Sequence, residues 1–599
     1  MRLRAVLAFG VALLTFGAGS PIQALADDSL IAMAKWGEEG GAGPGLTGDN
    51  DIPIGSDPTL GGPGGRTARL GTASGIQIND PGLDHIQAFS GTSTDPARFR
   101  PFEFSVQSET SLAAFGDNVV VGYNSSANQP VVLVGGNLLF THRFLSGYSF
   151  SHDAGATWAG GFIPPSTGSV FTAGDPSVAV DRDGTFLYAS LGLAPSGHFD
   201  VTVSRSTDGG TTFAPARIVD TDDGVDKEWI GVGPDPANGG NDSAYVTWTS
   251  FYPIIPNTPP TGSKLMFAKS TDGGITWSSP RTLFAPVDNG TLSSFIQFTN
   301  PVVDASSGRL YIPFLHFSDF DADFIKVLVS DNGGATFSFL NFNVPGAPET
   351  TGFPNVTPGT IADCGSPGGG VRLVLHSGAN MGGGRFGLPR YRHATRLVTQ
   401  PATAANHGQL FIAFNSSTSP SIGDPSSGSE IKMLFSPDGG SSWQLSAVAG
   451  ATDADRQHVH PAVSVDAQGE HVSVGYYVQQ ANEQLRVDLA TGQVTGHGVE
   501  FKSGKVQNLG APFDLTPSNN PIPRPAAPGQ PAQPFRTTNY DRSIVACYNI
   551  GEYMSTTYSH ERVIAAWGDN RNGWTSPTGS PAAGSHSQPD AFAEVVQAK

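Results

Sequence analysis

A short pattern recurs along this chain, and each copy places a polar residue just before Pro or the residue that replaces it. The seven residues in this column are Glu109, Asp175, Lys227, Asn300, Gln400, His460 and Glu552. The carboxylates could serve as general acids and bases, and the imidazole titrates near neutral pH. We regard these groups, with Glu228 beside the lysine, as catalytic candidates, and the lysine and two amides as substrate-binding candidates. The alternative is that they only satisfy backbone groups or pair with neighbouring elements.

The elements that position this column are predicted to be β-strands. Each copy of the pattern precedes a short turn and an aromatic-rich strand, as GDPSVAV precedes FLYASLG and VHPAVSV precedes HVSVGYYV. Alternating apolar and polar residues in both segments are typical of strands. The column therefore lies on the first strand of a repeated unit.

A second repeat follows in five of the units, and we call its copies the box segments. They read SHDAGATW at 151, STDGGTTF at 206, STDGGITW at 270, SDNGGATF at 330 and SPDGGSSW at 436. The Ser and the Asp or Asn suit hydrogen bonds to the backbone of a hairpin turn. The Gly at the fifth position suits a positive φ angle, and we call it the second Gly although the first copy has Ala before it. This accounts for the box carboxylates structurally, so we expect no catalysis from them.

Two strands followed by a hairpin make four strands, and their radial repetition predicts an all-β fold, a single β-propeller of four-stranded blades. We favour seven blades, with six as the alternative. First strands run beside the central channel, so the polar column should form a ring near one mouth. We expect the propeller over 81–599, with an insertion at 346–394 and a Pro-rich linker at 512–534. The final strand, near 590–596, should pair with one near 85–89.

The box segments resemble the Asp box of the bacterial neuraminidase repeat in the sialidase superfamily, over residues 100–599. The resemblance implies a sialidase-like fold. In that family three Arg bind the substrate carboxylate, a Tyr nucleophile pairs with a Glu, and an Asp is the acid and base. Phe99-Arg100-Pro101 matches the family's Phe-Arg-Ile-Pro motif only in part, because the Ile is missing. Arg100, Tyr540 and Arg542 are substrate-binding candidates on this basis.

Composition excludes several classes of function. Asp and Glu outnumber Lys and Arg by 52 to 33, whereas nucleic-acid binding requires clustered cations. We expect no cofactor and no metal site, although the acidic run at 220–226 has oxygens suited to calcium. Cys364 and Cys547 are the two cysteines of the chain, and nothing in the sequence shows whether they are bridged.

The beginning of the chain has the pattern of an export signal. Arg2 and Arg4 precede an apolar run, and Ala24-Leu25-Ala26 precedes two Asp residues, which predicts cleavage after Ala26. Residues 27–80 are rich in Gly and Asp and are expected to be a flexible leader. The mature protein is expected to be secreted, to the periplasm or the medium, and to act as a monomer without contact to a membrane or nucleic acid.

These observations favour a secreted carbohydrate-active propeller, a sialidase-like glycoside hydrolase with a glycan or polysaccharide as its partner. Two other functions stay open. One is a non-catalytic propeller that binds a glycan or a protein. The other is a polysaccharide lyase, which would use a His or Tyr base on an acidic sugar.

Overall fold

The computed structural model describes the strand-rich parts of the chain. These are residues 75–80, 107–125, 146–169, 171–194, 198–222, 224–252, 262–286, 294–318, 323–342, 400–417, 429–450, 455–480, 484–509, 553–574 and 586–597, with short strands at 66–67, 88–89, 131–134, 137–140, 353–355, 394–395, 513–514, 521–524, 533–536 and 547–548.

Seven antiparallel blades make up the fold, numbered here in chain order. Blades 1 to 3 consist of β4 (Gln107–Phe115), β5 (Asn118–Ser125), β8 (Ser146–Ser151) and β9 (Thr157–Phe162); β10 (Phe171–Val180), β11 (Phe186–Leu193), β12 (Phe199–Ser206) and β13 (Arg217–Asp222); and β14 (Val225–Pro234), β15 (Asp242–Tyr252), β16 (Gly262–Ser270) and β17 (Arg281–Phe284). Blades 4 and 5 consist of β18 (Ser294–Gln297) with β19 (Val302–Val303), β20 (Leu310–Ser318), β21 (Asp323–Ser330) and β22 (Ser338–Phe339); and β25 (Ala402–Asn406), β26 (Gln409–Ser417), β27 (Ser429–Ser436) and β28 (Gln444–Ala449). Blades 6 and 7 consist of β29 (Asp455–Val465), β30 (His471–Gln480), β31 (Gln484–Thr495) and β32 (Gly498–Asn508); and β37 (Ser555–Ser559), β38 (Arg562–Trp574), β39 (His586–Gln597) and β2 (Ile76–Gln77).

Short strands are added at the margins. They are β1 (Arg66–Thr67) on β9, β23 (Phe353–Asn355) on β21, β33 (Phe513–Asp514) on β31, β3 (Ala88–Phe89) on β6 (Val131–Val134) with β7 (Asn137–Phe140), β24 (Ala394–Thr395) on β36 (Cys547–Tyr548), and β34 (Pro521–Arg524) on β35 (Gln533–Arg536). The one helix among the described residues is the short 3-10 turn η5 (Pro236–Asn238). Within this part of the chain no helix has the length and apolar character needed to cross a membrane.

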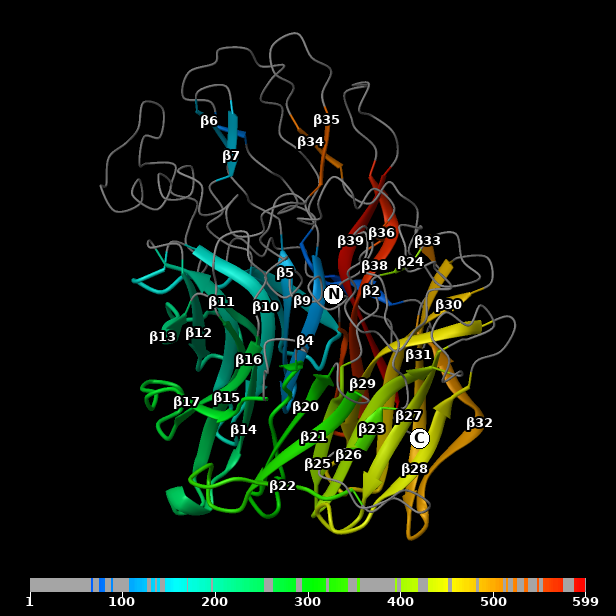
Figure 1. Cartoon of the computed structure of the whole chain (residues 1–599). Coiled ribbons are helices and arrows are strands. Elements are labelled where there is room, and N and C mark those ends of the chain that lie inside the picture. Colours follow the sequence, from blue (N-terminus) through cyan, green and yellow to red (C-terminus); the bar gives the residue numbers. More distant parts are fainter. Residues whose placement is uncertain are drawn as a thin grey trace.

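The first strands of the blades form a closed inner ring. Each first strand contacts those of its two neighbours, in the order β4, β10, β14, β19, β25, β29, β37 and back to β4. In Figure 1 the colours follow this path from blue through green and yellow to red, and β38 and β39 return beside β4. The prediction of an all-β propeller with seven blades is confirmed, and so is the placement of the repeated pattern on first strands.

Strand β2 completes blade 7 as its outermost strand. Ile76 and Gln77 pair with Ala593 and Phe592 of β39, so the last strand of the propeller is the predicted one. Its expected partner near 85–89 was wrong, because the nearby strand β3 pairs with β6 instead. The segment that contains β2 is buried, since Gln77, Ile78 and Asn79 are at most 7% exposed. Residues 75–79 therefore pack with the propeller, which we expected to begin at residue 81.

Asn79 holds this closing segment in place. Its side-chain nitrogen donates to Asp590 Oδ1 at 3.0 Å and to Gln107 Oε1 at 3.2 Å, and its Oδ1 accepts from the backbone N–H of Ala591 at 3.0 Å. One amide therefore joins the N-terminal segment to blades 7 and 1. Buried polar groups need such partners, and this network supplies them.

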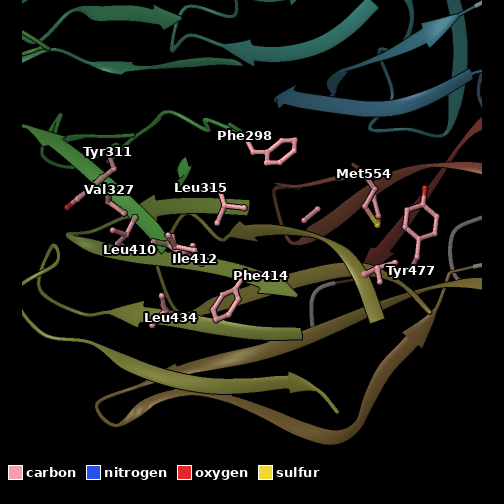
Figure 2. Packing of buried hydrophobic residues seen from close by; sticks show 14 of the residues in the cluster. Phe298, Tyr311, Leu315, Val327, Leu410, Ile412, Phe414, Leu434, Tyr477 and Met554 are labelled. Atoms are coloured by element: carbon pink, nitrogen blue, oxygen red, sulfur yellow. The ribbon is translucent and has the colours of Figure 1, made fainter. Parts of the chain in front are cut away.

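The apolar core lies between the faces of neighbouring blades. Figure 2 shows part of the largest cluster, in which Tyr311 and Val327 of blade 4 lie beside Leu410 and Ile412 of blade 5. These four residues are each 0% exposed. Burying each aliphatic side chain contributes about 1.5–3 kcal/mol, so the seams between blades supply much of the stability.

The box segments close the hairpins between third and fourth strands. In each one the Ser Oγ accepts from the backbone N–H of the second Gly, at distances from 2.7 to 2.9 Å. Asp272 Oδ1 accepts from the backbone N–H of Thr276 at 2.9 Å, and the Thr276 hydroxyl donates to its Oδ2 at 2.6 Å. Burial raises the pKa of this carboxyl, but these hydrogen bonds lower it more, and the net pKa is below the usual value. The carboxylate is thus used by the turn.

The second Gly of each box segment also sets the distance between blades. All five have φ between 79° and 97°. A Cβ added at any of them would lie 2.3–2.9 Å from an apolar side chain of the preceding blade. The pairs are Gly155 with Val595, Gly210 with Val120, Gly274 with Leu187, Gly334 with Phe267, and Gly440 with Leu340.

Replacing Gly210 by Ala should therefore destabilise the propeller more than the same change at Gly240. Both have a positive φ, 91° and 82°, so both variants pay about 1–2 kcal/mol for a left-handed Ala. Only at Gly210 would the Cβ meet a neighbour, Val120 Cγ2 at 2.3 Å, which adds about 1–3 kcal/mol of overpacking. Urea unfolding of both variants measures the difference. Equal losses would contradict the proposed role in blade spacing.

Candidate functional site

Four residues of the polar column share an unusual backbone conformation. Glu109, Asp175, Lys227 and His460 have φ of 57°, 54°, 51° and 51°, in the left-handed region. In each case the register between the first and second strands shifts at this point, so the residue lies in a β-bulge. Left-handed non-Gly residues are uncommon and cost about 1–3 kcal/mol, and they concentrate at functional sites.

The other three members of the column, Asn300, Gln400 and Glu552, are not among the left-handed residues of the described part of the chain. In blade 4 the left-handed residue is Phe298, with φ 60°, so the alignment placed Asn300 two residues too late. The irregular pairing of β18 and β19 with β20 explains the shift, and the Asn300 N–H donates to Pro313 O at 3.0 Å. Gln400 is half-buried just before β25. Glu552, Arg100, Tyr540 and Arg542 lie outside the described residues.

The bulges of blades 1, 2 and 3 bring three charged side chains together. Lys227 Nζ lies 3.1 Å from Asp175 Oδ2 and 3.6 Å from Glu109 Oε2. These side chains are 2%, 1% and 0% exposed. Asn124 connects the Glu109 carboxylate to the backbone of Asp175, because its Nδ2 donates to Glu109 Oε2 at 3.0 Å and its Oδ1 accepts from the Asp175 N–H at 2.7 Å. We call these four residues with Glu228 and Tyr553 the inner cluster.

Glu228 follows the lysine on β14 and is fully buried. Neither of its carboxylate oxygens has a hydrogen-bond partner among the described residues. Burial first, and then the charge of Asp175, raise the pKa of Glu228 well above its usual value. The protonated form is favoured, so the inner cluster combines a neutral acid with groups that carry charge.

Tyr553 is a member of the inner cluster that the sequence reasoning missed. It comes from the segment just before β37 in blade 7, and its hydroxyl donates to Pro176 O at 3.1 Å. Lys227 Nζ lies 5.4 Å from the centre of its ring, and the Trp229 ring lies 5.0 Å away. Burial, then Glu109 and two further carboxylates, raise the pKa of this phenol well above its usual value. The signal was available, because Tyr553 directly follows Glu552 in the seventh copy of the pattern.

His460 occupies a different environment. It is 2% exposed, and its ring meets the Tyr477 ring edge-on with 6.0 Å between centroids. The Tyr477 hydroxyl in turn donates to Gly568 O at 3.0 Å. His460 thus lies in the same kind of bulge as Glu109, Asp175 and Lys227, and its ring packs against the second strand of its own blade.

The acidic run at 220–226 is occupied by hydrogen bonds between blades. The Ser250 hydroxyl donates to Asp222 Oδ2 at 2.5 Å, and the Gln297 side-chain nitrogen donates to Asp226 Oδ2. Within the described ranges no group of three or more His, Cys, Asp or Glu is arranged to hold a metal ion.

Comparison with known proteins gives a likeness in fold only. No family profile matches the chain, and no curated protein matches it. Among solved structures, a Hadza microbial sialidase is 10% identical, with 89% of this chain and 96% of that one covered and a TM-score of 0.36. A Trypanosoma rangeli sialidase in complex with sialic acid is 12% identical, with 88% and 59% covered and a TM-score of 0.35. An ulvan lyase bound to its saccharide is 11% identical, with 66% and 81% covered and a TM-score of 0.36. At such values none of them assigns a substrate or an activity to this chain.

The raised pKa of Glu228 predicts a difference in pH dependence between the wild type and Glu228→Gln. The folded-state pKa lies above the unfolded value near 4.5, so the contribution of this carboxyl is full below that pH and is lost as the pH rises towards the folded pKa. Glutamine cannot ionise and lacks this loss. Relative to wild type, the variant should gain up to about 1.4 kcal/mol per pH unit above the unfolded pKa.

Urea unfolding at mildly acidic and neutral pH measures this gain. Glu430→Gln is the matched control, since Glu430 is 22% exposed and pairs with Lys432 at the surface of blade 5. Parallel stability curves for wild type and Glu228→Gln would show that the pKa of Glu228 is not raised.

Proposed function

We propose that this chain is a carbohydrate-active propeller and, more specifically, a sialidase-like glycoside hydrolase that acts on extracellular glycans. The observation that carries the proposal is the shared left-handed bulge of blades 1, 2 and 3, which gathers carboxyl groups with unlike surroundings. Hydrolysis of a glycosidic bond by two carboxyl groups requires one that is protonated and one that is ionised. This scheme differs from the Tyr nucleophile of the sialidase family, so the sialidase-like part of the proposal rests on the resemblance of the box segments.

The inner cluster offers both forms. Glu228 is the proposed general acid, which would protonate the leaving oxygen of the glycoside. Glu109 is the proposed ionised partner, because Asn124 donates to it and the Lys227 ammonium lies 3.6 Å away. Environments that push the pKa values of neighbouring carboxyl groups apart are a usual way to assign acid and base roles.

A non-catalytic propeller that binds a glycan or a protein is the second candidate, and burial favours it. Glu109 and Glu228 are each 0% exposed, so hydrolysis requires a path for the substrate to open. A lyase has less support from the inner cluster, since the raised pKa of Tyr553 keeps this phenol neutral and unsuited as a base.

The proposed setting follows from the sequence. The export signal at 1–26 would deliver the chain to the periplasm or the medium, where it would act as a monomer on glycans, without nucleic acid, a membrane or a cofactor. Calcium at 220–226 is the alternative for the last point. Sialic acid specificity would further require Arg100 and Arg542 to reach the substrate carboxylate.

Incubation of the full chain with fluorogenic sialosides and a polysaccharide panel tests the activity. Glu228→Gln and Glu109→Gln should each lower kcat by at least about 10²-fold, the usual contribution of a general acid or base. Glu430→Gln, a carboxylate outside the inner cluster, should retain wild-type turnover. Near-ultraviolet circular dichroism establishes that each variant is folded.

Three results are distinguishable. Turnover that survives both substitutions would remove the inner cluster from catalysis. Binding to a glycan array without turnover would favour the non-catalytic propeller. Products that absorb in the ultraviolet through a new double bond would identify a lyase.

A further inference from the structure

The ion pair of Lys227 and Asp175 joins two blades where water does not reach it. Lys227 is on β14 of blade 3 and Asp175 on β10 of blade 2, and their charged atoms are 3.1 Å apart. The two side chains are 2% and 1% exposed. Both residues are held by left-handed backbone in a bulge, which fixes where each side chain begins.

Burial changes which form of this pair is stable. In water an ammonium and a carboxylate are favoured over the amide because both ions are solvated. Moving each ion out of water costs several kcal/mol of desolvation free energy, whereas a neutral amide costs far less. The surroundings of the pair therefore favour condensation.

A third group suited to proton transfer touches the same nitrogen. Glu109 Oε2 lies 3.6 Å from Lys227 Nζ, and the Tyr553 ring, which Trp229 contacts, lies 5.4 Å from the same nitrogen. The Asn124 amide fixes this carboxylate from the other side at 3.0 Å. An amine, a carboxyl group and a proton carrier are thus within reach of one another in a desolvated site.

We propose that Lys227 and Asp175 form an intramolecular amide bond that links blade 2 covalently to blade 3. The Nζ–Cγ bond forms and one Cγ–O bond breaks. Glu109 accepts a proton from the ammonium and returns it to the departing oxygen, which leaves as water with two of the three ammonium hydrogens. Glu109 ends as it began, and no oxidant or other reactant is consumed.

The other lysine pairs of the structure are internal controls. Lys432 lies 2.8 Å from Glu430, closer than the inner pair, but the two side chains are 26% and 22% exposed. Lys269 contacts Asp235, whose side chain is 0% exposed, but Lys269 itself is 18% exposed. In both pairs the ammonium side chain keeps contact with water, so these pairs stay ionic.

The cross-link is tested apart from the proposed hydrolase activity, because its readout is a mass and not a turnover. Amide formation removes the Lys227 ammonium beside Glu109 and the Asp175 charge beside Glu228. In a cross-linked chain the ionised form of Glu109 would rest on the Asn124 hydrogen bond, and burial would remain the main cause of the raised pKa of Glu228.

Mass spectrometry of the reduced full chain tests the proposal directly. The wild type should be lighter than its sequence by one water, and Lys227→Arg and Asp175→Ala should carry the full mass. Trypsin should leave Lys227 uncleaved and yield one product in which residues 144–182 are joined to residues 218–264. Cleavage after Lys269 and Lys432 in the same digest shows that the exposed pairs are free.

A wild type with the full sequence mass would overturn the proposal without recourse to any variant. A missing water located in other peptides would overturn the assignment to Lys227 and Asp175. Glu109→Gln should also carry the full mass, and a variant that still lacks one water would overturn the role of Glu109 as proton carrier.

Discussion

The close approach of each blade to the one before it is the constraint on which this structure depends. Near the box segments a glycine without a side chain lies against an apolar group of the preceding blade, as Gly440 does against Leu340. At the inner ring hydroxyls bridge neighbouring first strands, and Ser111 Oγ accepts from the N–H of Val178 at 2.9 Å. Both ends of the seam are fixed, so the apolar faces between them pack at one distance.

Four of the first strands carry a left-handed bulge, at Glu109, Asp175, Lys227 and His460, and each bulge turns one side chain out of the ladder. Asp and His tolerate the left-handed region, but Glu and Lys do not favour it. Their contacts must therefore offset about 1–3 kcal/mol each. Glu109 and Lys227 achieve this through each other, since the strained positions are the ones whose charges meet.

The sequence allowed the blades to be predicted because their signals are local. Each hairpin turn and each alternating strand is encoded within a few residues, and the polar column emerged from aligning them. The two predictions that were wrong, the partner of the last strand and the position of Asn300, depend on contacts between residues that are distant in sequence. The choice of β2 over 85–89 rests on Asn79 meeting Asp590, more than five hundred residues later. The displacement of Asn300 by Phe298 rests on how β18 and β19 share β20, which no local pattern states.

The site itself was predictable in type but not in organisation. A column of polar residues suggests a ring of equivalent groups, yet Glu109, Asp175 and Lys227 form one ion-paired set, and Tyr553, which is not in the column, lies against its cation. The members of the column are not equivalent because Lys227 contacts the carboxylates at the bulges of blades 1 and 2 and so draws these two residues into one ion-paired set.

The need to pair buried charges limits which residues of the inner cluster can be substituted without loss of stability. Removing one partner of a buried ion pair leaves the other uncompensated, at a cost of about 3–5 kcal/mol. Lys227, Asp175 and Glu109 are bound by this rule, so stability and any chemistry at these positions cannot be varied separately. Glu228 is exempt, because its surroundings already favour the neutral form. Within the inner cluster it is the carboxyl group that the fold needs least as a charge, and therefore the one whose favoured form carries a proton that a general acid could donate.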